Sequence, residues 1–288
     1  MIKKADCHIH MVLDGVSNFR DAMRRHRESP DWKFIRQTLQ AYADEGIYYL
    51  RDGGDKYGAC LAAREIAPEY GISYLTPYFP IYKKGCYGAF IGEGFEYEND
   101  FYRLVKEIKA KKANFLKIMV SGLVDYEHYG QFIYEGPDKK TIKEMVHVGH
   151  EEGLKVMAHA SGERYLEAVI EAGTDSVEHG FYINNDCLIE MSERGTIWVP
   201  TVSTVGNLVD DERYPHEITK RIFEESMANI AKGAKMGVRI ACGSDAGAYR
   251  VPHVKGALDE MEYLKTAIGE KALEIVTEAN DGIFKNFV

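Results

Sequence analysis

The sequence predicts a closed barrel of eight parallel strands and eight helices, the (β/α)8 or TIM-barrel fold. Short apolar runs alternate with longer amphipathic stretches along the whole chain, which is the pattern of repeated strand–helix units. Eight such units in one chain are typical of this barrel. A barrel of this kind commonly takes about 250 residues, so the 288 residues are expected to form one domain, residues 1–288.

The expected strands follow the apolar runs in chain order. They are Ala5–Met11, Ile47–Asp52, Ser73–Phe79, Asn114–Val120, Lys155–Ala160, Ser176–Tyr182, Thr196–Ser203 and Val238–Ser244. Between them lie stretches of helical period, such as Thr141–Glu152, in which Ile142, Met145 and Val146 share one stripe. Glycines just before the next strand are expected to end several helices, at Gly46, Gly153, Gly173, Gly195 and Gly237. The alternative is an open doubly wound sheet, but no GxGxxG follows the first strand.

Three loops that follow expected strands are long: Pro80–Asn99, Gly122–Asp138 and Ser203–Pro215. The first two are rich in tyrosine and glycine. In a barrel, the loops at the carboxyl ends of the strands build the active-site mouth. We therefore predict that substrate contacts come from residues on such loops and at the end of the second strand. The candidates are Arg51, Tyr82, Tyr126, Tyr129, Tyr249 and Arg250.

Bulk composition excludes several classes of function. The formal net charge of −9 argues against nucleic acid or an anionic membrane as the main partner. Five dispersed cysteines without a CxxC motif indicate reduced thiols and a cytoplasmic protein. No apolar run approaches the roughly 20 residues of a membrane helix, and charged residues interrupt any signal-peptide core. We expect a cytoplasmic protein that acts on a small molecule.

Polar residues suited to bind metal lie at the ends of five expected strands. They are His8, His10, Lys117, His159, His179 and Asp245. Side chains two residues apart on a strand share a face, so His8 and His10 converge. A lone histidine at a strand end is most often an ordinary hydrogen-bonded residue. Four buried histidines without a metal, however, would leave many polar atoms to satisfy, so the sequence predicts a metal site at the mouth.

Three neighbouring polar residues have structural interpretations as well. Glu178 directly precedes His179, so alternation along a strand directs it to the opposite face, and we interpret it as structural. Arg51 and Asp52 end the second strand. They support the metal ligands from behind or form a structural salt bridge, and the sequence leaves both interpretations open.

The same elements resemble the amidohydrolase superfamily over Ala5 to about Asn286. The matching elements are His8-Ile9-His10, Lys117 in Phe-Leu-Lys-Ile-Met, His159 in Met-Ala-His-Ala, His179 in Val-Glu-His-Gly and Asp245 in Gly-Ser-Asp-Ala-Gly. Within the superfamily the chain most resembles the imidazolonepropionase and prolidase-like branch. That finer match is carried by Phe-Leu-Lys-Ile-Met-Val-Ser-Gly, Ala-Gly-Thr-Asp-Ser-Val-Glu-His-Gly and the Val-Pro-Thr of Val199–Thr201.

This resemblance implies a metal-dependent amidohydrolase that cleaves the C–N bond of an amide or cyclic amide through a metal-bridging hydroxide. It implies two divalent ions, with zinc the first choice for imidazole and carboxylate ligands. His8, His10 and Asp245 would hold the first ion, and His159 and His179 the second. Lys117 would react with CO₂ and bridge both ions as a carbamate. Asp245 would act as general base and then general acid.

The chain departs from the family in two places. Most relatives flank the barrel with a small β-sandwich built from both termini, and this sequence begins at the first strand. The sandwich is therefore expected to be absent, which exposes surface and favours a homo-oligomer. The segment Val-Ser-Gly-Leu-Val-Asp-Tyr also lacks the double glycine usual after the fourth strand, so the substrate contacts of the branch do not carry over.

Four other functions fit parts of the pattern. A deaminase of the superfamily usually needs one metal and lacks the bridging lysine, which Lys117 disfavours. Lactone and ester hydrolysis use the same centre as amide hydrolysis. An aldolase would use Lys117 as a Schiff-base nucleophile but would leave the four histidines without a role. A non-catalytic metal-binding barrel is the remaining alternative.

Overall fold

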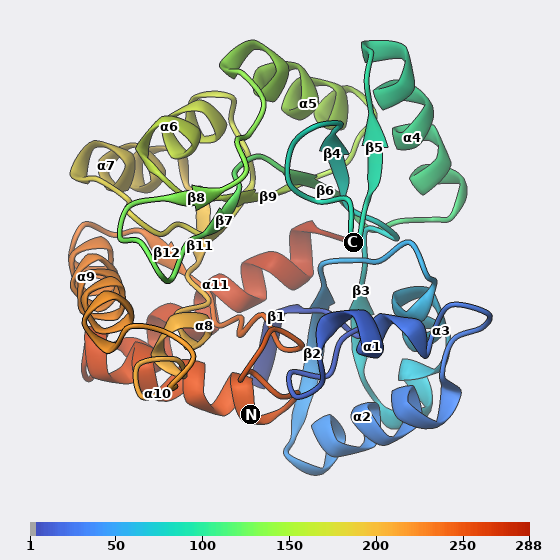
Figure 1. Ribbon diagram of the computed structural model, residues 1–288, viewed down its shortest axis with the longest axis horizontal. Helices are drawn as coiled ribbons and strands as arrows, with labels where there is room; N and C mark the ends of the chain where they lie inside the picture. The colour runs from blue at the N-terminus through green and yellow to red at the C-terminus, as the bar shows by residue number, and fades with distance from the viewer. Residues whose placement is uncertain (1–3) are drawn as a thin grey trace.

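The computed structural model describes residues 4–288, in which parallel strands form an inner layer and helices pack around them (Figure 1). Strands β1 (Lys4–Ile9), β2 (Ile47–Asp52) and β3 (Ser73–Leu75) form one parallel sheet. A second parallel sheet has the order β12-β11-β10-β9-β6-β4-β5. Its strands are β12 (Arg239–Ile240), β11 (Ile197–Val199), β10 (Ser176–His179), β9 (Val156–Ala160), β6 (Leu116–Met119), β4 (Ile81–Lys83) and β5 (Glu93–Phe95). The predicted α/β architecture with parallel strands is confirmed.

The chain passes from the first sheet to the second between β3 and β4. Strand β3 pairs with β2, whereas β4 pairs with β6. Pro77 and Pro80 lie in the five-residue connection and have no backbone N–H to donate, so regular pairing stops there. Tyr78 between them has a φ of +72°. The backbone N–H of Asn114 donates to the carbonyl of Thr76 (3.0 Å) and joins this connection to the segment that enters β6.

The other edges of the two sheets are joined by hydrogen bonds between β1 and the segment after β12. The N–H of Cys7 donates to the carbonyl of Cys242 (2.8 Å), and that of Asp245 to the carbonyl of His8 (2.7 Å). The N–H of His10 donates to Ala246 (2.7 Å). The last two bonds fix Asp245 beside the end of β1.

Helices of the outer layer follow the strands in chain order. They are α1 (Phe19–Arg24), α2 (Trp32–Asp44), α3 (Ala59–Ile66), the 3₁₀ turn η1 (Ala67–Tyr70), α4 (Glu98–Ala110), α5 (Lys139–Glu151), α6 (Glu163–Glu171), α7 (Asn185–Arg194), α8 (Ser203–Gly206), α9 (His216–Lys235), α10 (Lys255–Ile268) and α11 (Ala272–Asn286). The five glycines predicted to end helices all have φ between +71° and +85°, the conformation expected of a glycine after the last turn.

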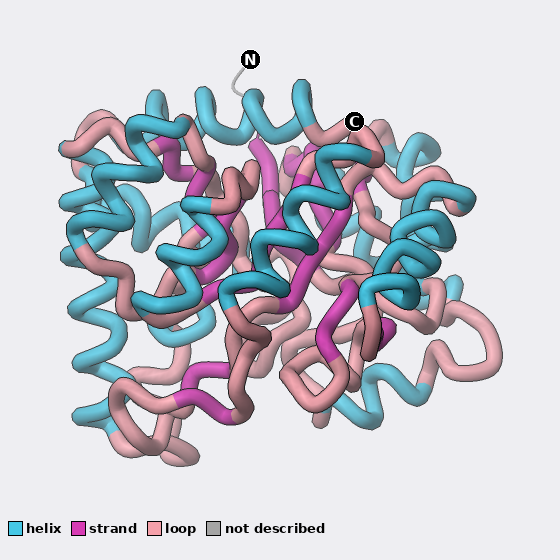
Figure 2. The backbone as a smooth tube through the Cα atoms, turned by 90° about the horizontal axis from the view of Figure 1, so that it is seen from above, coloured by secondary structure: helices cyan, strands magenta, loops and turns pink. Residues whose placement is uncertain are grey.

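The three long loops contain short regular elements that the sequence did not predict. Strands β4 and β5 lie in the first loop, and the hairpin of β7 (Leu123–Val124) and β8 (Phe132–Ile133) lies in the second. The third begins with α8. Elements of two or three residues are too short to show a hydrophobic period. Figure 2 shows β7, β8 and the long loops gathered at one end of the molecule, opposite the chain termini.

Alternate residues of the inner strands meet between the two sheets. Phe115, Met157, Ile197 and Val199 form one buried cluster with Phe287 from the end of α11. Two residues further along their strands, Lys117 and His159 lie nearer the carboxyl ends, as the two-residue period of a strand requires. Among residues 4–288, no helix is long and apolar enough to cross a membrane.

Candidate metal centre

The four histidines predicted as metal ligands form a continuous row at the carboxyl ends of the strands. Ring centroids lie 5.3 Å apart for His10 and His8, 5.1 Å for His8 and His179, and 4.4 Å for His179 and His159. Lys117 of β6 lies opposite Met157 of β9, two residues before His159. Burial lowers the pKa of each of the four rings, and the charge of Lys117 lowers it further. The structure therefore brings the histidines and the lysine together.

His8, His10 and Asp245 form the tightest part of the cluster. The Nε2 atoms of His8 and His10 lie 3.6 Å and 3.4 Å from Oδ1 of Asp245, and the three groups could hold one metal ion. The side chain of His8 is 1% exposed, whereas those of His10 and Asp245 are 15% and 16% exposed. A small molecule thus reaches this triad from the side of His10 and Asp245.

Several buried polar atoms at this cluster have no hydrogen-bond partner. Among the described residues 4–288 there are four such side-chain atoms: His10 Nδ1, Lys117 Nζ, His159 Nε2 and His26 Nε2. Three of the four belong to the cluster. Leaving a buried polar group unpaired costs about 1–3 kcal/mol, so three at one place fit a site built to receive metal ligation.

Burial keeps the histidines neutral. It is the largest cause that lowers the pKa of His10 and of His159 to about 3, and it lowers the pKa of His8 and His179 well below the usual value. Burial also lowers the pKa of Lys117, against the attraction of Glu178 and Asp245. Neutral imidazole is the form that binds metals, and a neutral amine is the form that reacts with CO₂.

Glu178 lies on the same side as His8, so its assignment to the opposite face was wrong. Its Oε2 accepts a hydrogen bond from Nδ1 of His8 at 2.8 Å, and its carboxylate pairs with Arg51 (2.8 Å to Oε1). His179 has a φ of +71°, so strand alternation ends there. Consecutive residues can then both reach the site. Glu178 fixes the ring of His8 and leaves Nε2 of His8 to face Asp245.

Arg51 lies beneath the histidines and does not line the mouth. Its side chain is 0% exposed. The guanidinium donates to the carbonyl of Cys7 (2.7 Å), to Oγ of Ser176 (2.9 Å) and to the Glu178 carboxylate. These four bonds and the burial of Arg51 leave it no exposed donor, so its predicted substrate contact is disfavoured and stays untested. Both structural interpretations of Arg51 from the sequence therefore describe its place. It supports His8 from behind through Glu178, and it forms a buried salt bridge.

Thr201 orients His179, a role that sequence reasoning did not assign. Its Oγ1 lies 2.8 Å from Nδ1 of His179, which leaves Nε2 of that ring for other contacts. Thr201 and Asp245 have φ values of +49° and +60°, and non-glycine residues in this region cost about 1–3 kcal/mol. The Val-Pro-Thr motif was the available sequence signal for Thr201.

Gly53 makes room for His10. A Cβ at this position would lie 2.4 Å from Cε1 of the His10 ring, so any side chain would displace the ring. The N–H of Gly53 donates to the carbonyl of Ile9 (2.8 Å). This places the glycine directly beside the strand that carries His10.

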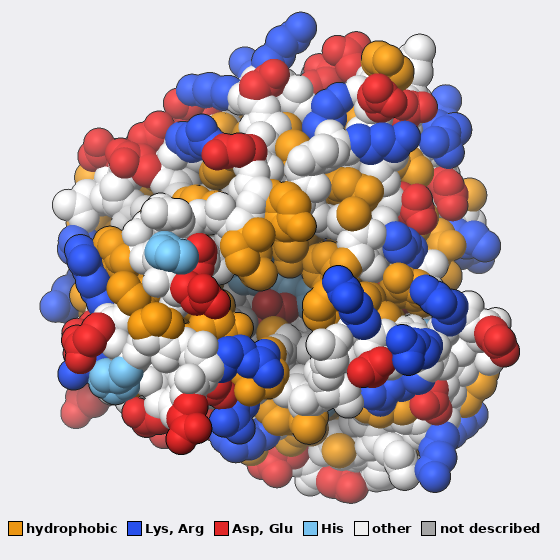
Figure 3. All heavy atoms as spheres, in the orientation of Figure 1, with side chains coloured by type: hydrophobic (Ala, Val, Ile, Leu, Met, Phe, Trp, Pro, Cys, Tyr) orange, Lys and Arg blue, Asp and Glu red, His pale blue; other side chains and the backbone are white. Residues whose placement is uncertain are grey.

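A hollow opens above the cluster. Figure 3 shows it at the centre of the face, with histidine and acidic side chains at its floor and hydrophobic side chains around its rim. Tyr87 lies at its wall, because its ring centroid is 5.3 Å from that of His159. Tyr126 is also close, since the charge of Asp245 raises the pKa of its hydroxyl in addition to burial.

The remaining predicted substrate contacts are engaged with other groups. Arg250 and Tyr249 both bond Asp211, from Nε at 2.6 Å and from the hydroxyl at 3.1 Å. The hydroxyl of Tyr129 bonds Glu225 of α9. Tyr82 packs closely against the first loop: an added Cβ at Gly94 would lie 2.7 Å from Cζ of its ring, and one at Gly88 would lie 2.7 Å from its Cβ. Substrate contact by these four stays a prediction.

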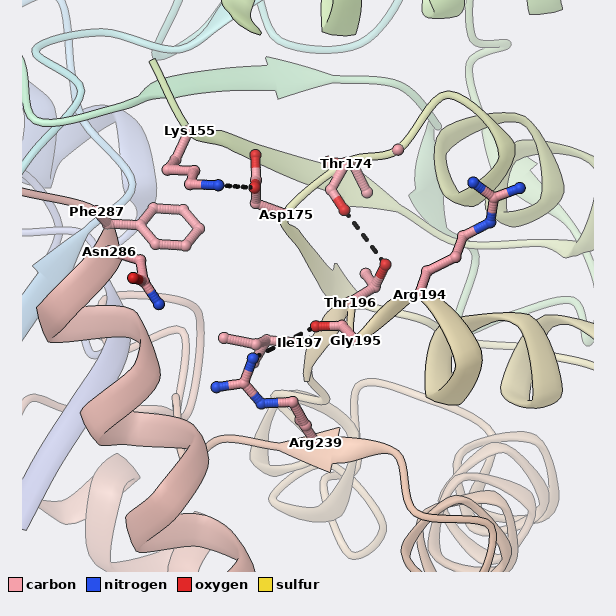
Figure 4. A pocket seen from close by; sticks show the side chains of 11 residues that line it. Lys155, Thr174, Asp175, Arg194, Gly195, Thr196, Ile197, Arg239, Asn286 and Phe287 are labelled. Carbon is pink, nitrogen blue, oxygen red and sulfur yellow. Dashed lines mark hydrogen bonds and ion pairs between the residues drawn. The ribbon is translucent and has the colours of Figure 1, made fainter. Parts of the chain in front are cut away.

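A separate cavity of about 400 Å³ lies at the opposite, amino ends of β9 to β12. In Figure 4, Lys155 is paired with Asp175, and Arg239 lies next to Gly195. Phe287 of the C-terminal segment lines the same cavity. None of the six predicted ligands lines this cavity. The chemistry-bearing residues thus lie at the carboxyl ends, as barrel-type α/β proteins place them.

Fold and cluster define a parallel α/β protein with a metal-type histidine and aspartate site. Residues 2–279 match the amidohydrolase family, and the chain belongs to that family. It is 26% identical to ochratoxinase of Aspergillus niger over 95% of this chain and 65% of that protein. It is 31% identical to an uncharacterized protein of Mycobacterium tuberculosis over 37% of this chain and 30% of that protein. The matches thus span less than two thirds of these relatives.

Solved structures of similar fold include ochratoxinase of A. niger and a Xaa-Pro dipeptidase. The ochratoxinase has a TM-score of 0.81 and 18% identity, and the match covers 96% of this chain and 69% of that one. The dipeptidase has a TM-score of 0.75 and 19% identity, with 99% and 75% covered. The predicted resemblance to amidohydrolases of the prolidase-like branch is confirmed.

Proposed function

We propose that this chain is a metal-dependent hydrolase that cleaves the C–N bond of an amide or cyclic amide in a small molecule. The observation that carries the proposal is the cluster itself. Buried, neutral histidines, an amine of lowered pKa and a carboxylate meet at one hollow, and three of their nitrogen atoms lack a partner. Membership of the amidohydrolase family supports the reaction class.

The donor set fits two divalent ions, with zinc the first choice. His8, His10 and Asp245 would hold one ion, and His159 and His179 the other, because imidazole and carboxylate are preferred zinc ligands. Metal ions in such a site lower the pKa of the attacking water and polarise the scissile carbonyl.

Lys117 would join the ions as a carbamate. Its neutral amine would attack the carbon of CO₂: an N–C bond forms, one C=O π bond of CO₂ opens to give the carboxylate, and one proton leaves the nitrogen for solvent. Burial favours the neutral amine over the ammonium. The product is an anion and would attract two cations, whereas an ammonium group at the same place would repel them.

Asp245 would move the proton during hydrolysis. Its carboxylate accepts a proton from the attacking water and then donates it to the leaving nitrogen. Burial raises the pKa of the Asp245 carboxyl group in the metal-free protein. Glu178 and Thr201 hold His8 and His179 in place during these steps.

We also propose that the two joined sheets form one closed (β/α)8 barrel. The hydrogen bonds from Cys7 to Cys242 and from Asn114 to Thr76 connect the sheets at both junctions. Closure would hold the residues of β1 against those of β9 and β10 as one rigid site.

Hydrolysis of a defined panel by metal-stripped and zinc-reloaded protein tests this function. The panel pairs each N-acyl amino acid, Xaa-Pro dipeptide and cyclic amide with the corresponding ester or lactone, and includes an aminopyrimidine for deamination. We expect amide cleavage that is lost on stripping and restored by zinc. Turnover of none of the amides by the reloaded protein, or equal turnover after stripping, would contradict the proposal.

A further inference from the structure

We propose that the substrate carries a planar aromatic ring that packs against Tyr87 on the His159 side of the hollow. This substrate class rests on the proposed hydrolase function. The proposal comes from a row of aromatic side chains, Phe19, Phe90, Tyr87 and Tyr134, which we call the aromatic wall.

The aromatic wall runs from the protein surface to the histidine cluster. Its ring centroids are 6.0 Å apart for Phe19 and Phe90, and 5.5 Å apart for Phe90 and Tyr87. Tyr134 stacks on Tyr87 at 6.4 Å with an interplanar angle of 28°. Tyr87 then meets the ring of His159 at 5.3 Å. These are the separations at which aromatic rings attract one another.

Three separate segments contribute to the wall. Phe19 begins α1, Tyr87 and Phe90 lie between β4 and β5, and Tyr134 follows β8. Phe19 and Tyr134 are 45% and 61% exposed. Single exposed aromatic residues are common, but a contiguous apolar surface that leads into a hollow marks a binding site. The orange rim around the hollow in Figure 3 is consistent with such a surface.

The wall offers ring faces and edges without charge. Its four side chains are two phenylalanines and two tyrosines, so the wall carries no carboxylate, ammonium or guanidinium group. A flat ring between these side chains can stack on one and meet the edge of another. A charged group would lose water there without a charged partner in the wall.

Two matched substrate pairs test the inference with zinc-loaded protein. N-benzoyl-alanine is compared with N-cyclohexanecarbonyl-alanine, and N-acetyl-phenylalanine with N-acetyl-cyclohexylalanine. Each pair keeps the scissile bond and the approximate ring size but removes planarity. An aromatic pair contributes about 0.5–1.5 kcal/mol beyond area burial, so we expect kcat/KM to favour the planar member of at least one pair about 2- to 12-fold.

Variants of Tyr87 test whether the aromatic wall causes the preference for the planar substrate. Tyr87→Leu should reduce the ratio to about one, whereas Tyr87→Phe should preserve it because the ring remains. Tyr48→Leu, at an exposed tyrosine of β2, is the control and should keep the wild-type ratio. Equal kcat/KM values in both pairs, or a preference that survives Tyr87→Leu, would overturn the proposal.

Binding of products separates this inference from the proposed function. Calorimetric titration of the zinc-loaded protein with benzoate and with cyclohexanecarboxylate requires no turnover. Tighter binding of benzoate that is lost in Tyr87→Leu supports ring binding by the aromatic wall. If no amide is cleaved in that case, only the proposed hydrolase function fails. Equal binding of the two acids, together with equal kcat/KM for the amides, overturns the proposal that the aromatic wall binds a planar ring. Amide turnover would still support the hydrolase function in that case.

Discussion

At the scale of single residues, the sequence predicted polar side chains that the structure brings together, but not the groups that hold them. The six predicted side chains follow strands, and strand ends are recognisable from apolar runs. Glu178 was misplaced because strict alternation fails where His179 adopts a φ of +71°. Tyr87 belongs to a loop, and loop conformation leaves no period in a sequence. Both became evident only from contacts with His8 and His159.

Glu178→Gln tests the orienting role of the carboxylate. The amide keeps the size of the side chain but removes the charge-assisted hydrogen bond to His8 and the ion pair with Arg51. Loss of such a partner typically lowers metal affinity 10- to 100-fold, which competition with a zinc chelator measures. The control is Glu260→Gln, another fully buried carboxyl group without a contact to the ligands. An equal loss in both variants would show that burial alone, and not orientation of His8, explains the effect.

Gly53→Ala tests the space that His10 needs. The new Cβ would lie 2.4 Å from the His10 ring, so the ring must move and zinc affinity should fall about tenfold or more. Gly149→Ala is the matched control, because its Cβ would crowd Val156 and Leu116 and not a ligand. We expect both variants to unfold at lower urea concentration, but only Gly53→Ala to bind zinc more weakly. Unchanged affinity in Gly53→Ala would contradict this role.

At the scale of elements, the strands and the helix ends were predictable from the sequence. The short strands and the short helix within the long loops were not. All eight expected strands are present, because buried parallel strands read as apolar runs. The division at Pro77 and Pro80 was missed, although proline in a strand is a signal for interrupted pairing.

Helix α8 is held by Glu260 of α10, whose carboxyl group accepts hydrogen bonds from the N–H groups of Val202 and Ser203 (3.1 and 2.7 Å).

Glu260 is expected to make stability depend on pH. Burial raises its pKa from 4.5 to about 8, so the folded state binds a proton more tightly than the unfolded state. The stabilisation is therefore complete below pH 4.5 and is lost as the pH rises through about 8. Chemical unfolding of wild type and Glu260→Gln across this range measures it. The difference between the two should change steadily from pH 5 to pH 8, and a constant difference would contradict the assignment.

At the scale of the whole molecule, the parallel α/β architecture and family followed from the sequence, whereas the junctions between the sheets did not. Those junctions depend on single backbone hydrogen bonds, at Cys7 and Asn114, and no side-chain pattern specifies them. The end of the molecule that carries the chemistry was predictable, because catalytic groups of such barrels lie at the carboxyl ends of the strands.

Hydrogen exchange tests whether the strands close into one barrel. If they do, the amides of Cys7 and Asn114 should exchange as slowly as that of Val177 in the interior strand β10, because all three lie within a continuous ladder. Deuterium uptake followed by NMR on the metal-free protein measures this. Exchange at Cys7 and Asn114 as fast as in exposed loops would indicate two open sheets.

The metal content of protein purified without chelator tests the central claim most directly. A binuclear centre formed by His8, His10, Lys117, His159, His179 and Asp245 predicts about two divalent ions per chain by elemental analysis, and a clear loss in Lys117→Ala. A content near one ion would contradict the binuclear arrangement and leave only the group of His8, His10 and Asp245. A content well below one ion per chain would contradict the metal-dependent hydrolase itself.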